Sequence, residues 1–115
     1  MHPFQMSVSD AVIRGYEELL LISEQMLEAA RAGNWDAMSE LQQVYVGEVD
    51  QLRALGPHPA PSAAERSRRY QLLERILAHD AAIRQIVMPQ MSQLEALLGS
   101  TRRQRELGQA YGVST

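Results

Sequence analysis

Apolar residues recur every three or four positions through most of this 115-residue chain, and two short segments interrupt the pattern. This spacing places apolar side chains on one face of an α-helix, whereas a strand would need strict alternation. The interruptions are Gly33–Asn34 and the proline-rich stretch Pro57–Pro61. The pattern therefore predicts an all-α fold built from three helices.

The first two predicted helices form a hairpin. The first begins after Ser9, whose hydroxyl can accept from the free N–H groups of the first turn, and it ends at Gly33. Asn34 is the expected N-cap of the second helix, which runs from Trp35 to about Leu55. Because the connection is so short, we expect the two helices to pack antiparallel.

The third predicted helix is longer than the other two. Ser62 and Glu65 form a capping box at its start, and the apolar pattern continues to Gly99. At the rise of an α-helix the first two helices are roughly 30 to 35 Å long, and the third is about 54 Å. Pro89 falls where the cover from the shorter helices ends, so we expect a kink or a break there. The architecture predicted is an antiparallel three-helix bundle followed by a short C-terminal helical segment.

The apolar stripe of the third helix continues around and beyond Pro89, where no other helix is long enough to cover it. Its members there are Met88, Met91, Leu94, Leu97 and Leu98. The C-terminal segment, a second copy of the chain or another protein could cover them. We therefore divide the chain into a helical bundle domain, residues 1–98, and a C-terminal segment, residues 99–115.

Composition excludes several other classes of protein. Hydrophobic residues make up 45% and charged residues 22%, which is typical of a globular domain. The net charge of -3 does not favour binding to nucleic acid, and the absence of cysteine excludes disulfides. The longest aliphatic run, Leu19–Ile22, is far too short to span a membrane, and the first residues lack a secretion signal. We expect a cytoplasmic protein with no membrane partner.

Side chains that could carry chemistry do not combine into a site. His2, His58 and His79 are not spaced as metal ligands, and no paired acid, base or nucleophile is recognisable. Arginine clusters occur at the start of the third helix and in the C-terminal segment. Without interleaved aromatic residues they indicate a solvated face or contact with residues 1–55, which hold nine acidic residues against three arginines. We predict no enzyme activity, no metal and no cofactor.

Several motifs together resemble one known family, the flagellar protein FliT family. They are the run Tyr16–Leu27, the turn Ala32-Gly-Asn-Trp-Asp36, the positions Leu41, Val44 and Tyr45, the segment Ile83–Pro89 and the pair Ala110-Tyr111. The resemblance spans nearly the whole chain. It implies a small cytoplasmic chaperone of flagellar type III export that binds the filament cap protein FliD and keeps it unassembled.

The resemblance also implies which residues carry the function. The FliD-binding surface falls on Tyr45, Val49, Ile83, Ile86 and Val87, to which the uncovered stripe adds Met91 and Leu94. The C-terminal segment would be regulatory, and its candidate residues are Arg102, Arg103, Arg105, Leu107 and Tyr111. Contacts with the flagellar export ATPase and a flagellar transcriptional regulator are further implied partners. The alternative is a structural homo-oligomer, such as a homodimer, or an adaptor without an export role.

Overall fold

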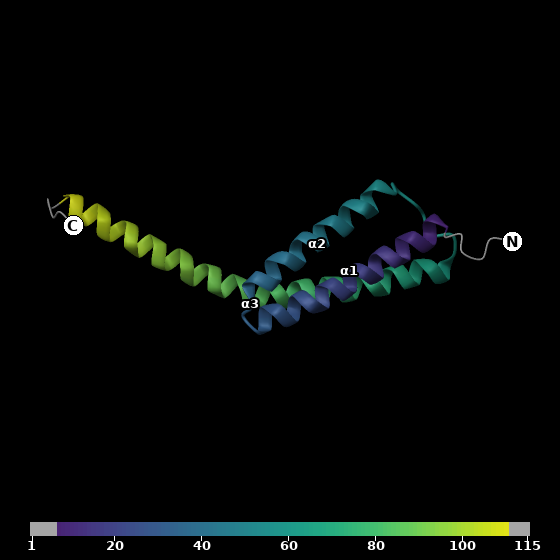
Figure 1. The fold of residues 1–115 in the computed structure, drawn as a ribbon, viewed down its shortest axis with the longest axis horizontal. Coiled ribbons are helices and arrows are strands. Elements are labelled where there is room, and N and C mark those ends of the chain that lie inside the picture. The colour runs from purple at the N-terminus through teal and green to yellow at the C-terminus, as the bar shows by residue number, and fades with distance from the viewer. Residues whose placement is uncertain (1–6, 111–115) are drawn as a thin grey trace. The chain divides into compact units, whose positions relative to one another are not determined.

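The computed structural model describes residues 7–110, with side chains at all of these positions except 101, 109 and 110. This part of the chain forms three helices and no strand: α1 (Val8–Arg31), α2 (Trp35–Ala54) and α3 (Ala63–Ala110) (Figure 1). The chain divides into two compact units within α3: the first unit ends at Ile83 and the second begins at Arg84. The all-α prediction is confirmed, and the two units are described separately below.

The first helix begins two residues earlier than predicted. Ser7, not Ser9, is the N-cap: its hydroxyl accepts from the Asp10 N–H (3.1 Å), and its own N–H donates to the Asp10 carboxylate (3.3 Å). This reciprocal pair satisfies two backbone groups at once, because Asp10 stands three residues after Ser7. Ser9 lies inside the first turn of α1, and its hydroxyl donates to the Glu65 carboxylate of α3.

The predicted turn between α1 and α2 is confirmed in detail. Gly33 adopts a φ of 69°, the left-handed conformation that glycine tolerates best. The Gly33 N–H donates to the Ala30 carbonyl (3.1 Å) and the Asn34 N–H to the Ala29 carbonyl (2.9 Å), so the last carbonyls of α1 are satisfied. The Asn34 side chain then caps α2 by accepting from the Ala37 N–H (3.2 Å).

The segment between α2 and α3 is held to the bundle by side-chain contacts. Gly56 ends α2 with a φ of 77° and donates its N–H to the Arg53 carbonyl (3.0 Å). The His58 ring contacts the Leu55 carbonyl, and the Arg69 guanidinium donates to the His58 carbonyl (2.6 Å). This linker is non-helical, as its prolines predict.

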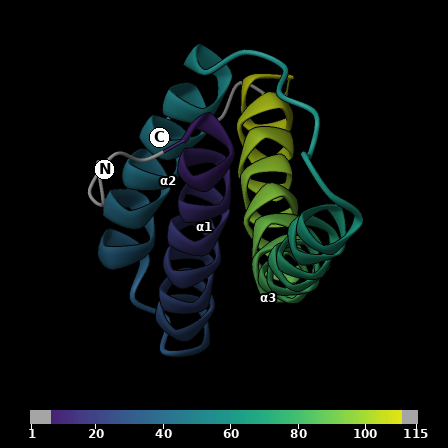
Figure 2. The same cartoon turned by 90° about the vertical axis from the view of Figure 1, so that its right-hand side faces the viewer.

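The first unit has its core along α1. The central cluster combines α1 with α3, and partly buried side chains from α1 and α2 pack against it: Leu19, Leu20, Leu72 and Ile76 form the cluster, and Ile13, Tyr16, Tyr45, Val49 and Leu52 surround it. Figure 2 shows α1 between α2 and the part of α3 that belongs to the first unit. This position explains why α1 has buried residues from Val12 to Ala30 while α2 has none.

One polar side chain lies inside this core with its hydrogen bonds satisfied. Ser23 is 2% exposed, and its hydroxyl donates to the Leu20 carbonyl (2.7 Å) and lies 3.0 Å from His79 Nδ1. A hydroxyl that donates to the Leu20 carbonyl can accept from His79 Nδ1 when that nitrogen carries the ring proton. A second link between α1 and α3 is the ion pair of Glu24 with Arg75 (3.5 Å).

The third helix continues through Pro89 and Gly99, so of the kink or break predicted at Pro89 the break is absent, and the predicted C-terminal helical segment is the last part of α3. Proline removes one N–H, which leaves the carbonyl of Gln85 without its helical partner. Both Gln85 and Pro89 are exposed, so water can satisfy that carbonyl. The Met, Gln, Leu, Glu and Ala residues that follow are strong helix formers and favour continuation.

The two compact units meet between Ile83 and Arg84. The second unit is therefore mainly one helical segment, from Arg84 to Ala110. The division into a bundle domain, residues 1–98, and a C-terminal segment, residues 99–115, stays a prediction. A regulatory role for residues 99–115 stays a prediction as well.

Candidate partner-binding surfaces

Three of the predicted partner-binding residues belong to the interior of the first unit. Tyr45 and Val49 pack from α2 against the central cluster, and Ile83 is 7% exposed. Their side chains already contact the protein itself, which leaves less of their surface for a partner. Partner binding through these positions stays a prediction.

The electrostatic environment of Tyr45 reflects this packing. Partial burial raises the pKa of its phenol above the ordinary value of 10.0, and the nearby Asp80 carboxylate raises it further. Both causes disfavour the negatively charged phenolate. Tyr45 is therefore neutral at physiological pH and packs as a neutral side chain against the central cluster.

The other predicted residues lie on the second unit, where exposure increases along the helix. Ile86 and Val87 are half-buried, whereas Met91 is 54% and Leu94 is 57% exposed. Further large apolar side chains on this segment are also more than half exposed: Met88, Leu97, Leu98 and Leu107. The uncovered stripe predicted from helix length is thus present on α3.

The geometry of this stripe suits a helix-binding surface. Val87, Met91, Leu94 and Leu98 are separated by four, three and four residues, so their side chains share one face of α3. Apolar residues at these steps form the seam along which helices pack against one another. We name Val87, Met91, Leu94 and Leu98 the α3 seam.

The predicted regulatory residues lie beyond the seam on the same helix. Arg102, Arg103 and Arg105 are exposed, as is Leu107. Tyr111 lies outside the described residues. The structure thus presents three cationic side chains and one apolar side chain to solvent, and their regulatory role is untested.

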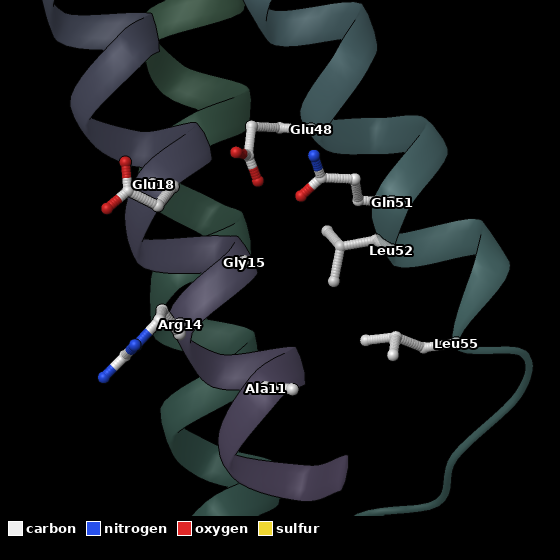
Figure 3. Close-up of a pocket in the computed structure, with 8 residues that line it drawn as sticks. All are labelled: Ala11, Arg14, Gly15, Glu18, Glu48, Gln51, Leu52 and Leu55. Atoms are coloured by element: carbon white, nitrogen blue, oxygen red, sulfur yellow. The ribbon is translucent and has the colours of Figure 1, made fainter. Parts of the chain in front are cut away.

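A cavity of about 410 Å³ lies in the first unit, where α2 diverges from α1 (Figures 1 and 3). Leu52 and Leu55 project from α2 toward α1, with Glu48 and Gln51 beside them (Figure 3). A Cβ atom at Gly15 would lie 2.5 Å from Leu52 Cδ2, so Leu52 packs where α1 has no side chain. This cavity has apolar walls and a polar rim.

The described residues do not form a catalytic or metal-binding arrangement. Among them, no group of three or more His, Cys, Asp or Glu side chains could hold a metal ion. None of the helices within residues 7–110 is long and apolar enough to cross a membrane.

Sequence reasoning missed one important contact network. The Arg69 guanidinium donates to the Ser9 hydroxyl (3.3 Å) and to the Glu65 carboxylate (3.5 Å) in addition to the His58 carbonyl. It thereby joins α1, the linker and α3. The four-residue spacing of Glu65 and Arg69 signals the ion pair, but the contacts with Ser9 and His58 depend on the tertiary fold.

The fold and its surface define a class: a small helical protein that presents apolar helix faces and has the features of a protein-binding module. The family model for flagellar protein FliT matches residues 13–113. The chain therefore belongs to the FliT family of flagellar proteins, which supports a role as a flagellar chaperone.

Individual relatives agree with this assignment. The chain is 27% identical to flagellar protein FliT of Pectobacterium atrosepticum over 103 residues, covering 87% of this chain and 79% of the relative. It is 29% identical to that of Yersinia pseudotuberculosis over 97 residues, covering 84% and 81%. The crystal structure of flagellar protein FliT from Bordetella bronchiseptica matches with a TM-score of 0.70 and 38% identity, covering 75% of this chain and 97% of that one.

Proposed function

We propose that this chain is a cytoplasmic chaperone of flagellar type III export that binds the filament cap protein FliD through the α3 seam. The observation that carries the proposal is the exposure of apolar side chains at helical spacing on the second unit. A helical segment of a partner can lay its own apolar face on such a seam. The role is binding, without catalysis.

Energetics indicate how large the complementary surface must be. The exposed members of the seam are Met91, Leu94 and Leu98, at 54%, 57% and 60%. Burying the exposed part of each contributes about 1 kcal/mol, whereas association costs about 4 to 15 kcal/mol. A stable complex therefore needs the flanking Met88 and Leu97 and further contacts as well.

Co-expression with FliD followed by size-exclusion chromatography tests this function. We expect the two proteins to co-elute at micromolar concentration. Separate elution would refute the proposal. The alternative, a structural homo-oligomer covering its own seam, predicts a constant dimer mass in light scattering over a dilution series, and a monomer at all concentrations would exclude it.

Residues 99–115 are the proposed regulatory segment, acting on the same binding event. The supporting observation is that Arg102, Arg103 and Arg105 lie exposed on the helix that carries the seam. The export ATPase and a flagellar transcriptional regulator are the further proposed partners. Removing residues 102–115 should change FliD affinity measured by calorimetry, and an unchanged affinity would argue against regulation of FliD binding.

A further inference from the structure

A second cavity, of about 380 Å³, lies on the first unit between α1, the linker and the first turns of α3. Tyr16, Tyr70, Leu73 and Pro59 line it with aromatic and aliphatic surface, and Arg66 and Arg69 add positive charge. All of these residues precede Ile83, so the cavity belongs to the first unit, whereas the α3 seam belongs to the second. We name it the α1–α3 cavity.

One wall of this cavity is held firmly in place. The Arg69 side chain is 15% exposed and is held by the His58 carbonyl, the Ser9 hydroxyl and the Glu65 carboxylate. Its buried Nε has no hydrogen-bond partner among the described residues. Because the Glu65 carboxylate neutralises the charge of Arg69, this arginine mainly forms a wall of the cavity and holds the linker beside it.

Arg66 differs from Arg69 because it is available for a ligand. It is exposed, and within residues 7–110 its guanidinium makes no hydrogen bond or ion pair. The hydroxyls of Tyr16 and Tyr70 likewise make no hydrogen bond to this part of the chain. The cavity therefore offers a free guanidinium and two phenol donors next to apolar walls, a combination suited to a carboxylate on an apolar segment.

Apolar surface continues from the cavity along α3. Tyr70 is 62% exposed, Leu73 is 37% and Leu77 is 54%. Their spacing of three and four residues places them on one helix face, which begins one turn after Arg66. A partner helix with apolar residues at matching steps would cover this face and bring its end to the cavity.

We propose that the α1–α3 cavity and this α3 face bind an amphipathic helical segment of a partner protein, whose Asp or Glu side chain pairs with Arg66. The positive charge of Arg66 at this cavity favours an acidic segment. The apolar side chains of that segment lie on Tyr70, Leu73 and Leu77. This site is independent of the proposed FliD contact on the α3 seam.

Three synthetic helical peptides test the proposal by chemical-shift titration of the full chain. Each peptide carries Leu at positions i, i+3 and i+7. The first peptide also carries one Glu a turn before these leucines and one Glu a turn after them. One of the two carboxylates therefore reaches Arg66 whether the peptide binds parallel or antiparallel to α3. The second peptide has Gln at both positions and an amidated end. The third has Gln and a free terminal carboxylate.

We expect the Glu peptide to shift the backbone amides of Tyr16, Arg66, Tyr70 and Leu73 saturably. The Gln amide should bind about threefold more weakly, the effect of one partly exposed charge pair. Arg66→Gln should remove that difference. Arg68→Gln is the matched control, because Arg68 is exposed and does not line the cavity.

Equal affinity of the Glu and Gln peptides, or an unchanged difference in Arg66→Gln, would overturn the pairing. Shifts confined to residues 87–98 would overturn the site. If the third peptide binds more tightly than the first, Arg66 pairs with a terminal carboxylate and not with an Asp or Glu side chain, and the proposed pairing is refuted. Leu94→Asp should leave peptide affinity unchanged, which separates this test from the proposed FliD contact.

Discussion

Replacing Leu94 by Asp is the sharpest test of the α3 seam. The Leu94 side chain is 57% exposed, so the protein alone loses little packing when it is removed. A partner that covers the seam would lose about 1 kcal/mol of apolar burial and would have to desolvate a carboxylate at a further cost of about 1 to 3 kcal/mol. The sum of about 2 to 4 kcal/mol corresponds to a Kd for FliD raised by about 30- to 700-fold.

Gln93→Asp is the matched control for this substitution. Gln93 is exposed on the same helix, next to Leu94 in the sequence. Both variants gain one negative charge, and both lose about 0.5 kcal/mol of helix propensity. Only the change at Leu94 removes a member of the seam, so only this variant should bind FliD weakly.

Isothermal titration calorimetry with FliD measures the affinities, and far-ultraviolet circular dichroism monitors folding. We expect both variants to keep near-wild-type helical signal. If Leu94→Asp binds FliD as tightly as Gln93→Asp does, the seam is not the contact surface. If Leu94→Asp alone loses helical signal, the side chain supports folding and the reasoning from its exposure is wrong.

The remaining predictions concern the first unit. Gly15→Ala and Gly47→Ala each gain up to about 1 kcal/mol of helix propensity, but the added methyl group at Gly15 overpacks against Leu52 at a cost of about 1 to 3 kcal/mol, whereas Gly47 has open space around it. Gly47→Ala should therefore raise the free energy of unfolding, and Gly15→Ala should have a clearly lower value than Gly47→Ala; urea denaturation measures both, and equal values would contradict the packing. The raised pKa of Tyr45 contributes stability that is fully present below the unfolded pKa of 10.0 and is lost as the pH rises through the folded pKa. Tyr45→Phe should therefore show a smaller loss of stability between neutral pH and pH values above 10.0 in denaturation curves, and an identical pH dependence would refute this. Arg69→Met should destabilise the chain by about 1 to 3 kcal/mol by removing its buried hydrogen bonds, while the exposed Arg68→Met should change stability by less than about 0.5 kcal/mol; equal melting temperatures for these two variants would contradict the network.

Both proposed surfaces follow from the same property of α3. Its apolar residues exceed what the core of the first unit uses, since Leu72 and Ile76 are buried while Leu73 and Leu77 remain partly or largely exposed. A helix that is apolar over more than one face can pack on the core and still present a side to another protein. In a flagellar chaperone such a surface is compatible with binding more than one partner.

Local features of this fold could be predicted from the sequence because they depend on neighbouring residues. Gly33 and Asn34 specify the turn through a left-handed φ and a side-chain cap. Ser62 accepts from the Glu65 N–H at the start of α3 (3.2 Å), as the capping pattern predicts. The capping box also predicts that the Glu65 carboxylate accepts from the Ser62 N–H. In the structure this carboxylate contacts the Ser9 hydroxyl and the Arg69 guanidinium, which the sequence pattern cannot predict.

The helical period also predicted an uncovered apolar stripe, and Met91 and Leu94 are exposed as expected. The period could not predict that Tyr45 and Ile83, which lie on similar stripes, pack in the interior of the first unit. Periodicity defines which residues share a face, but only the packing of several helices decides which face is covered. The sequence also left open whether α3 kinks or breaks at Pro89, since the cost of the proline depends on whether water can reach the carbonyl that it leaves free; the structure has no break there.

The sequence by itself thus determined three helices, the turns that join them and an apolar surplus on the third, because backbone propensity, capping and side-chain period are local properties. The tertiary structure alone decided that α1 occupies the middle of the first unit (Figure 2). It also decided that Arg69 joins α1, the linker and α3 through its hydrogen bonds. It decided further that Arg66 lines a cavity and that its guanidinium makes no hydrogen bond or ion pair within residues 7–110. These outcomes depend on contacts between residues far apart in the chain, and local sequence patterns do not specify such contacts.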